Sequence, residues 1–389
     1  MGDEKEEESE DLTPTNVRLT EPPSGSLPPA TPADVMDTSK LHPTSIKNII
    51  VTGVTGQDGS HMVDYLLKNT PHKIYGGIRR LSVPNHTNIE HLLNEPRFEL
   101  ISLDLTDDYS IRDCIIDIQP DFFINFAAQS FVAGSWEYPI QTWVTDSTAV
   151  LHMLESIRRF MPLCRFYNAG SSEEFGDVIH PTQDEEHPLR PQSPYGAAKA
   201  AARQLVRVYR ESYDLYAVQG WLFNHEGTRR GLQFVTRKIS HAVAKMKLAL
   251  ENNEPIPVLK LGNLQAERDW SDTEDFMSGV WMMMNQNNPK NYVLASGEMH
   301  SVREFLDMTL GLAGIEFRTE GKDEHEKYYN KNDELIFEVN IDYYRPAEVH
   351  KLCGDPSLVE KELGWKRTTD FPKLVKKMYD NDYELLKNA

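Results

Sequence analysis

The amino-acid sequence predicts an α/β protein built on a doubly wound parallel sheet. Between residues 48 and 223, short apolar segments alternate with helical patterns, and repeated strand–helix units of this kind specify a parallel sheet with helices on both faces. The first segment, residues 48–51, runs into a glycine-rich turn and then into the helical pattern of Met62 and Leu66. Ligands of such sheets lie at the carboxyl ends of the strands, so functional residues are expected there.

The chain contains three stretches of different composition. Residues 1–46 combine an acidic block with repeated prolines; they cannot bury enough apolar area to offset their ordering entropy and are predicted to form a disordered tail. Residues 47–223 carry the strand–helix alternation, and residues 224–389 are expected to form a smaller C-terminal α/β domain for the substrate. Residues 291–295 are a candidate strand that rejoins the first sheet, whereas the polar stretch 319–334 is interpreted as an exposed insertion.

Charge and cysteine content exclude several classes of protein. The net charge of −19 argues against nucleic acid as a partner, because phosphate backbones are held by clustered Lys and Arg. The 3 cysteines have no metal-ligand spacing and are expected to be reduced core residues, so no metal site is predicted. No apolar run approaches the ~18 residues of a membrane span, and the acidic N-terminus is unlike a signal peptide. We therefore expect a cytoplasmic protein without a membrane partner.

The glycine-rich turn of residues 53–59 has the position of a phosphate-binding loop. Its glycines, Gly53, Gly56 and Gly59, have the spacing G-x-x-G-x-x-G. A strand, a glycine turn and a helix begin a Rossmann unit, in which the backbone approaches a pyrophosphate held by the amides of the helix N-terminus. The turn therefore predicts a dinucleotide cofactor and a Rossmann domain over residues 47–223; a plain glycine turn is the alternative.

The following strand, residues 73–78, ends at Arg79 and Arg80. NAD-binding proteins usually have an acidic residue there, which accepts hydrogen bonds from the adenosine ribose. Two guanidinium groups would instead form charge-assisted hydrogen bonds with a 2′-phosphate, which favours NADP over NAD. A solvated basic turn is the alternative interpretation.

Tyr195 and Lys199 are four residues apart at the start of a predicted helix. Positions i and i+4 share a helix face, so the lysine charge can lie beside the phenol and favour the phenolate. Tyrosine normally loses its proton near pH ~10, and a nearby cation lowers its pKa. The pair thus predicts a general base; an ordinary amphipathic helix is the alternative.

A second polar group, residues 170–173, follows the predicted strand that begins near Arg165. It contains Ser171, Ser172 and Glu173, which could simply cap a helix. Its position, however, faces the same crevice as Tyr195. A carboxylate and a phenol in one pocket suit proton removal at two neighbouring carbons.

Polar and basic residues follow the last strand of the alternating region. His225 comes after the apolar strand of residues 216–223 and is either a structural or a ligand-binding histidine. The second half of the chain also supplies arginines that could clamp a diphosphate. These are Arg229, Arg230, Arg237, Arg268 and Arg345.

With these residues in place, the chain resembles the GDP-mannose 4,6-dehydratases, a family of extended short-chain dehydrogenases/reductases. The resemblance runs from about residue 48 to residue 386 and leaves the tail outside. It rests on motifs at residues 52–60, 128–130, 190–195, 222–226, 234–238, 261–263, 268–270 and 344–349.

The resemblance implies conversion of GDP-mannose to GDP-4-keto-6-deoxymannose, a first step towards GDP-fucose or other GDP-6-deoxyhexoses. Hydride leaves C4 of the sugar for NADP and returns at C6. Tyr195, supported by Lys199, would take the proton of the 4-hydroxyl. Glu173 would abstract the C5 proton, and Ser171 and Glu173 would assist loss of the C6 hydroxyl as water.

The resemblance also implies a set of binding residues and an oligomer. The positions that match cofactor-binding residues are Gly53, Thr55, Gly56, Gln57, Asp58, Gly59, Arg79, Arg80, Asp104, Leu105, Ala127, Ala128, Gln129, Ser130, Tyr195, Lys199, His225 and Arg230. The residues expected to contact the nucleotide sugar are Ser172, Asn224, Arg237, Lys238, Arg268, Arg345 and Glu348. A homodimer or homotetramer is expected.

The chain departs from the usual family pattern at several positions. Ser171 stands where Thr is usual, Phe131 where His is usual, Gln141 where Tyr is usual, and residues 227–228 are Gly-Thr where Ser-Pro is usual. These departures leave the exact sugar open.

Two alternatives therefore remain. The first is a related nucleotide-sugar enzyme, such as a GDP-heptose dehydratase, a 4-epimerase or a 4-reductase. Glu173 discriminates, because epimerases and reductases need no base at C5. The second, from another class, is a catalytically silent dinucleotide-binding protein.

Overall fold

The computed structural model describes residues 45–343 and 352–388. The chain divides into two compact units, Met1–Ser45 and Ile46–Ala389, and every element named below belongs to the second. In the described ranges, no helix is both long enough and apolar enough to cross a membrane. The predicted tail of residues 1–46 lies almost entirely outside the described residues and stays a prediction.

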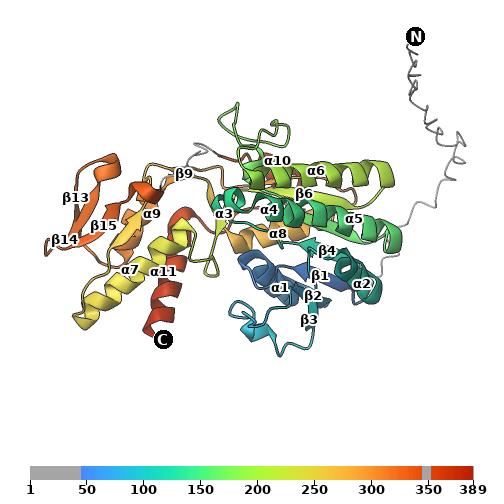
Figure 1. Cartoon of the computed structure of the whole chain (residues 1–389), viewed down its shortest axis with the longest axis horizontal. Coiled ribbons are helices and arrows are strands. Elements are labelled where there is room, and N and C mark those ends of the chain that lie inside the picture. The colour runs from blue at the N-terminus through green and yellow to red at the C-terminus, as the bar shows by residue number, and fades with distance from the viewer. Residues whose placement is uncertain (1–44, 344–351, 389) are drawn as a thin grey trace, which may run out of the picture. The chain divides into compact units, whose positions relative to one another are not determined.

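A sheet of seven parallel strands forms the centre of the described part of the chain (Figure 1). In spatial order its strands are β11 (Val293–Leu294), β6 (Ala217–Leu222), β5 (Arg165–Ala169), β4 (Phe122–Asn125), β1 (Asn48–Thr52), β2 (Lys73–Ile78) and β3 (Phe98–Ser102). The direction of winding reverses between β1 and β4, so ligands are expected at the carboxyl ends of these two strands. The α/β fold class predicted from the sequence is confirmed.

Helices cover both faces of this sheet because its strands present apolar side chains on both sides. In β1, Ile49 and Val51 join the core formed with α1 (Gln57–Asn69) and α8 (Thr273–Met284), whereas Ile50 joins the opposite core. That second core is completed by α2 (Asp108–Ile118), α5 (Ala149–Phe160) and α6 (Pro194–Tyr213). Side chains alternate across a strand, so a strand buried on both faces is apolar throughout.

The helical pattern predicted over residues 143–158 is more irregular than expected. Two short helices, α3 (Val132–Glu137) and α4 (Pro139–Trp143), come first. A turn of π-helix, η3 (Val144–Thr148), then leads into α5. Such π-turns are rare and occur frequently at functional sites.

A second, smaller sheet lies in the C-terminal half, with strand order β13 (Phe317–Glu320), β14 (Lys327–Asn330), β15 (Leu335–Val339) and β8 (Leu259–Leu261). Figure 1 shows it beside α7 (Val235–Asn252), α9 (Val302–Leu312) and α11 (Phe371–Lys387). These elements share a core of their own. The interpretation of residues 319–334 as an exposed insertion is wrong: Tyr328 is completely buried, and β14 pairs on both sides.

Two short strand pairs connect the sheets. β7 (Asn224–Glu226) pairs with β10 (Trp270–Asp272), and β9 (Glu267–Arg268) pairs with β12 (His300–Ser301). Both α8 and β11 come after residue 224 but pack on the first sheet. The domain boundary predicted at residue 223 stays a prediction.

Candidate active site

The glycine turn after β1 packs tightly against the loop after β4. Gly53 has φ +69°, a left-handed conformation that favours glycine, and an added Cβ there would lie 2.8 Å from the amide nitrogen of Ala127. An added Cβ on Gly59, in the first turn of α1, would lie 2.4 Å from the carbonyl oxygen of Gly53. Two segments expected to bind the cofactor are thus brought together at the N-terminus of α1.

Asp58 and His225, both expected at the cofactor, form a buried pair. His225 Nε2 lies 2.9 Å from Asp58 Oδ2, and its Nδ1 lies 2.7 Å from the carbonyl oxygen of Phe223. Both ring nitrogens face acceptors, as an imidazolium requires. Burial alone would lower the pKa of His225, but the charge and hydrogen bond of Asp58 raise it above its usual value. Gln57 reinforces the junction, because its Nε2 donates to the carbonyl oxygen of His225 at 3.1 Å.

The basic pair at the end of β2 is directed to solvent. Arg79 and Arg80 are exposed, and neither guanidinium pairs with a carboxylate among the described residues. Asp104 and Leu105 follow β3 at the neighbouring strand end; the Asp104 carboxylate accepts a 2.9 Å hydrogen bond from the backbone N–H of Thr106 and shapes that turn. These four residues follow the carboxyl ends of β2 and β3, and their contact with a cofactor stays a prediction.

The segment after β4 is held by side chains from β1 and η3 and by one of its own. Ala127 N–H donates to the Thr52 hydroxyl at 3.1 Å, and Gln129 N–H donates to Asp146 Oδ1 at 2.7 Å. The Gln129 side chain in turn accepts from Phe131 N–H at 2.7 Å. This part of the expected cofactor site is therefore rigidly positioned. Asp146, in η3, is a contributor that the sequence analysis did not identify.

Tyr195 and Lys199 project from the first turns of α6. Ser193 caps the helix by accepting from Gly196 N–H at 3.0 Å, and Pro194 occupies its first position. Lys199 Nζ donates to the carbonyl oxygen of Ala169 at 2.9 Å and lies 5.8 Å from the centre of the Tyr195 ring. The shared helix face predicted for the two side chains is confirmed by this geometry.

The ionisation of Tyr195 differs from the expectation. Burial raises the pKa of the phenol, and the negative charge of Asp146 adds to this; the Ser171 side chain acts in the opposite direction. The predicted lowering of this pKa by Lys199 is therefore wrong for the described residues, because desolvation outweighs the attraction of the ammonium group.

The residues after β5 meet the start of α6. Ser171 is the N-cap of a short 3₁₀ helix, η4 (Ser172–Glu174), and its Oγ accepts from Glu173 N–H at 3.2 Å. The helix-cap alternative thus holds for Ser171, but the same side chain also acts on Tyr195, whose pKa it lowers. An added Cβ on Gly196 would lie 2.6 Å from the carbonyl oxygen of Glu173. The backbone of η4 thus packs against the start of α6, and the catalytic roles expected for Ser171, Glu173 and Tyr195 stay predictions.

Comparison with known proteins assigns this arrangement to a family. The sequence profile described as GDP-mannose 4,6 dehydratase matches residues 50–378. The chain belongs to the GDP-mannose 4,6-dehydratase family. A relative named GDP-mannose 4,6 dehydratase 2, from Arabidopsis thaliana, is 40% identical over 361 residues, covering 90% of each chain. The human GDP-mannose 4,6 dehydratase is 38% identical over 87% of this chain and 92% of its own length.

Solved structures support the fold at lower sequence similarity. The dTDP-glucose 4,6-dehydratase DesIV from Streptomyces venezuelae, with NAD and TYD bound, has a TM-score of 0.72 at 20% identity and covers 88% of this chain and 97% of its own. A UDP-glucose 4-epimerase from Thermotoga maritima has a TM-score of 0.71 at 19% identity, with coverage of 88% and 100%. The fold of this chain is thus shared by a dehydratase and an epimerase.

The substrate residues expected of this family member fall into different environments. Ser172 is buried in η4, and Asn224 begins β7. Lys238 Nζ lies 5.5 Å from the centre of the Tyr343 ring, and Arg268 NH1 donates to the carbonyl oxygen of Glu267 at 2.7 Å. The expected residues Arg345 and Glu348 lie outside the described residues.

Arg237 has a structural role that the sequence analysis did not foresee. Its Nε donates to Asp382 Oδ1 at 2.6 Å, and its NH1 donates to the carbonyl oxygens of Thr228 and Arg230 at 2.7 and 2.9 Å. Because Asp382 is completely buried in α11, the guanidinium fastens α7 to the C-terminal helix. We therefore leave Arg237 out of the proposed substrate site.

A polar ladder crosses the carboxyl half of the central sheet and was missed in the sequence. The links run Thr52 Oγ1 to Asn125 Oδ1 at 2.5 Å, Asn125 Nδ2 to Asn168 Oδ1 at 2.8 Å, and Asn168 Nδ2 to Gln219 Oε1 at 2.7 Å. Its end is Glu174, which accepts from Gln219 Nε2 at 3.1 Å. All five side chains are buried, so each depends on its neighbours in the ladder for hydrogen bonds that water cannot supply. The ladder aligns the ends of β1, β4, β5 and β6, which carry the candidate site.

The ladder is closed by a buried ion pair. Arg203, on α6, pairs with Glu174 and also donates to the carbonyl oxygen of Gln219 at 2.8 Å. Its guanidinium carbon lies 3.4 Å from the centre of the Trp221 ring. The sequence contained one indication of this ion pair, because Arg203 is a charged residue on the apolar face of the α6 pattern, four positions after Lys199. Its partner Glu174 could not be identified from sequence spacing.

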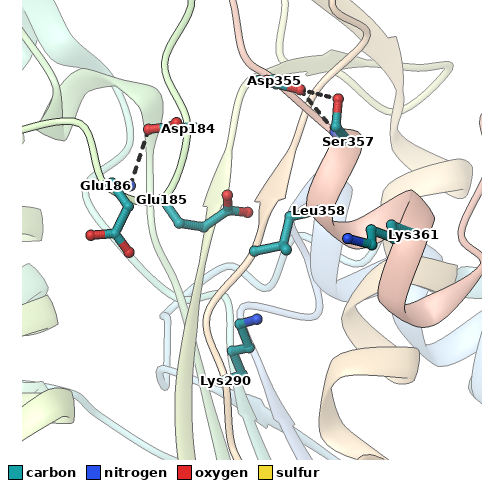
Figure 2. A pocket seen from close by; sticks show the side chains of 8 residues that line it. All are labelled: Asp184, Glu185, Glu186, Lys290, Asp355, Ser357, Leu358 and Lys361. Atoms are coloured by element: carbon teal, nitrogen blue, oxygen red, sulfur yellow. Dashed lines mark hydrogen bonds between the residues drawn. The ribbon is translucent and has the colours of Figure 1, made fainter.

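A surface pocket of about 420 Å³ lies away from these residues. Figure 2 shows its lining, which contains none of the predicted site residues. Its carboxylates are used in local structure: Asp184 accepts from Glu186 N–H at 3.1 Å, and Glu185 accepts from Val293 N–H at 2.7 Å. We assign no role in the family's reaction to this pocket.

Proposed function

We propose that this chain is an NADP-dependent GDP-mannose 4,6-dehydratase, which forms GDP-4-keto-6-deoxymannose and water. The observation that carries the proposal is the junction of η4 and α6, where the Glu173 backbone lies against Gly196 and the Ser171 side chain favours ionisation of the Tyr195 phenol. The proposal assigns the Glu173 carboxylate, the Ser171 hydroxyl and the Tyr195 phenol to this junction, at the carboxyl edge of the sheet. Family membership supplies the reaction to which these groups are fitted.

The residues divide the proton transfers between them. Tyr195 takes the proton of the sugar 4-hydroxyl as C4 is oxidised, and the Lys199 ammonium stabilises the phenolate. The resulting 4-keto group acidifies the C5 proton, which Glu173 removes. Ser171 and Glu173 then deliver a proton to the C6 hydroxyl, which departs as water. As C6 is reduced, C5 takes up a proton, which balances the one that Tyr195 removed from the 4-hydroxyl, so Tyr195 and Glu173 return to their starting states.

The glycine turn and the basic pair fit a nicotinamide dinucleotide. A side chain at Gly53 or Gly59 would collide with neighbouring backbone atoms. Because glycine has no side chain, the turn can stay close to the start of α1, whose amides would bind a pyrophosphate. Arg79 and Arg80 would hold the 2′-phosphate of NADP. When bound, the nicotinamide supplies a hydride acceptor for C4 and returns the hydride at C6.

The decisive experiment incubates the full-length protein with GDP-mannose and NADP and measures the alkaline absorbance and mass of a 4-keto-6-deoxy product. The proposal expects product from wild type and none from Glu173→Gln, which keeps cofactor binding. The matched control, Glu186→Gln, changes an exposed carboxylate of the pocket in Figure 2 and should leave turnover unchanged. Full dehydration by Glu173→Gln would remove the assignment of Glu173.

Other outcomes select between the alternatives. Product from a different nucleotide sugar, with none from GDP-mannose, favours the related enzymes of the same fold. Cofactor binding without any product favours a silent binding protein. Specificity for NADP is tested by the ratio of NADP to NAD affinities, which Arg79→Ala and Arg80→Ala should lower.

The family resemblance also supports a homodimer or homotetramer as the working form. Sedimentation velocity of the full chain measures this directly, and a purely monomeric species would contradict it. Cytoplasmic location stays a prediction.

A further inference from the structure

Asp146 is a buried carboxyl group that the proposed proton transfers do not use. It lies in η3, the π-turn between α4 and α5, and only 1% of it is exposed. Its Oδ1 accepts from Gln129 N–H at 2.7 Å, and its Oδ2 is buried without a hydrogen-bond partner among the described residues. An unpaired carboxylate oxygen in such a place is costly and calls for a compensating charge.

The compensating charge comes from α6, against which η3 packs. Lys199 is the ionisable side chain whose charge favours the ionised form of Asp146. Tyr195 lies on the same face of α6, and the negative charge of Asp146 raises its pKa. These three groups form one electrostatic unit.

The other charged neighbours of η3 raise the pKa of Tyr195 less than Asp146 does. The α4 helix and the loop of residues 126–131 contain no ionisable side chain. On α5, Glu155 is paired with Arg158 and Arg159, and His152 is the remaining titratable neighbour. On η4, Glu174 is paired with Arg203, while Glu173 acts on Tyr195.

We propose that Asp146 is a positioning residue of the Tyr195–Lys199 pair, which holds the Gln129 loop through Oδ1 and sets, through its charge, the pH at which Tyr195 gives up its proton. The proposal rests on the proposed function for its substrate, but its electrostatic part concerns this chain's own groups. The proposal also gives the π-turn η3 a role, because η3 carries Asp146 and packs against α6.

The direction of the effect follows from the charges. Burial raises the pKa of Asp146 to about 6, against the opposing effects of Lys199 and the Gln129 N–H. Above that pH the carboxylate is negative and opposes a second negative charge on Tyr195, whose pKa is already raised by burial. Removing the charge while keeping the acceptor should therefore make the phenol easier to ionise.

The test compares Asp146→Asn with wild type as full-length, NADP-loaded protein. An asparagine keeps an oxygen for the Gln129 N–H but carries no charge. We expect the acid limb of the kcat profile for GDP-mannose to move to lower pH by about 1 unit, a tenfold higher relative rate on that limb. A profile with unchanged shape, merely scaled down, would show a structural role alone and overturn the proposal.

A second readout keeps the proposal separate from the proposed function. The ultraviolet absorbance of tyrosinate is titrated in each protein and in its Tyr195→Phe counterpart, and the difference reports Tyr195. This transition should occur at lower pH in Asp146→Asn, and an unmoved transition overturns the proposal even if wild type makes no product. If wild type forms no product but the Tyr195 transition is shifted in Asp146→Asn, the proposed function is contradicted and the role of Asp146 is supported.

Two further variants separate charge from positioning. Asp146→Ser, a second neutral substitution, repeats the titration should Asp146→Asn fail to fold. Asp146→Ala removes the acceptor as well, and should additionally weaken NADP binding several-fold, measured by fluorescence titration, because the Gln129 N–H loses its partner. Equal NADP affinity in Asp146→Ala and Asp146→Asn would overturn the positioning part.

Discussion

Lys199 donates a 2.9 Å hydrogen bond from its ammonium group to the carbonyl oxygen of Ala169, the last residue of β5. This bond ties the second turn of α6 to the strand end from which Ser171 and Glu173 follow. Only 3% of Lys199 is exposed, so its charge acts in a desolvated environment where electrostatic effects are large. The position of the ammonium group is thereby set by the sheet rather than by the helix alone.

Replacing Lys199 should therefore impair the oxidation step specifically. Lys199→Met keeps the length and apolar stem but removes the charge, and we expect the rate of cofactor reduction on adding GDP-mannose to fall roughly 10²–10⁴-fold, the usual range for general acid–base effects. Lys199→Arg should not restore it, because a planar guanidinium cannot replace a compact ammonium in a buried site. Stopped-flow absorbance at the reduced-nicotinamide band measures this, and a fall of less than threefold in Lys199→Met would contradict the assigned role.

The Glu174–Arg203 pair predicts a large stability effect. Glu174→Gln leaves the buried guanidinium of Arg203 without a counter-charge, which typically costs about 3–5 kcal/mol. The exposed pair of Lys73 and Glu99, 2.8 Å apart, provides the control, and Glu99→Gln should change the free energy of unfolding by less than about 1 kcal/mol. Urea denaturation measures both; equal losses in the two variants would contradict the burial argument.

The two helical glycines Gly59 and Gly311 should respond oppositely to alanine. A Cβ on Gly59 would overlap the Gly53 carbonyl, so Gly59→Ala should lose about 1–3 kcal/mol and weaken cofactor binding. Gly311, on α9, has no atom within 4 Å of the added Cβ, so Gly311→Ala should gain up to about 1 kcal/mol from helix propensity. Thermal unfolding with and without NADP separates the two effects, and a neutral Gly59→Ala would show that the loop can relax.

Stability should depend on pH through the Asp58–His225 pair. The pKa of His225 is raised above its usual 6.5, so the charged pair contributes fully below about pH 6.5 and its contribution is lost as pH rises through the higher folded value. His225→Gln should therefore destabilise the protein more at pH 6 than at pH 9. Urea denaturation at the two pH values provides the measurement, with His325→Gln as the control because His325 is 83% exposed. An equal loss at both pH values would mean that His225 is neutral.

Patterns local in the sequence predicted most of the fold and much of the candidate site. The alternation of strands and helices gave the parallel sheet, since each element's period is a property of a few consecutive residues. The glycine turn and the spacing of Tyr195 and Lys199 were readable for the same reason. Ser171 and Glu173 could be placed because the carboxyl ends of parallel strands meet at one edge.

Contacts between distant residues could be decided only by tertiary structure. The raised pKa of Tyr195 depends on burial and on Asp146, 49 positions earlier; the pairing of Arg237 with Asp382 spans 145 positions. Local periodicity carries no information about such partners, since it records which face a residue occupies and not what lies opposite. Desolvation and charge pairing, which set the chemistry of Tyr195 and Lys199, exist only once the sheet and the helices enclose them.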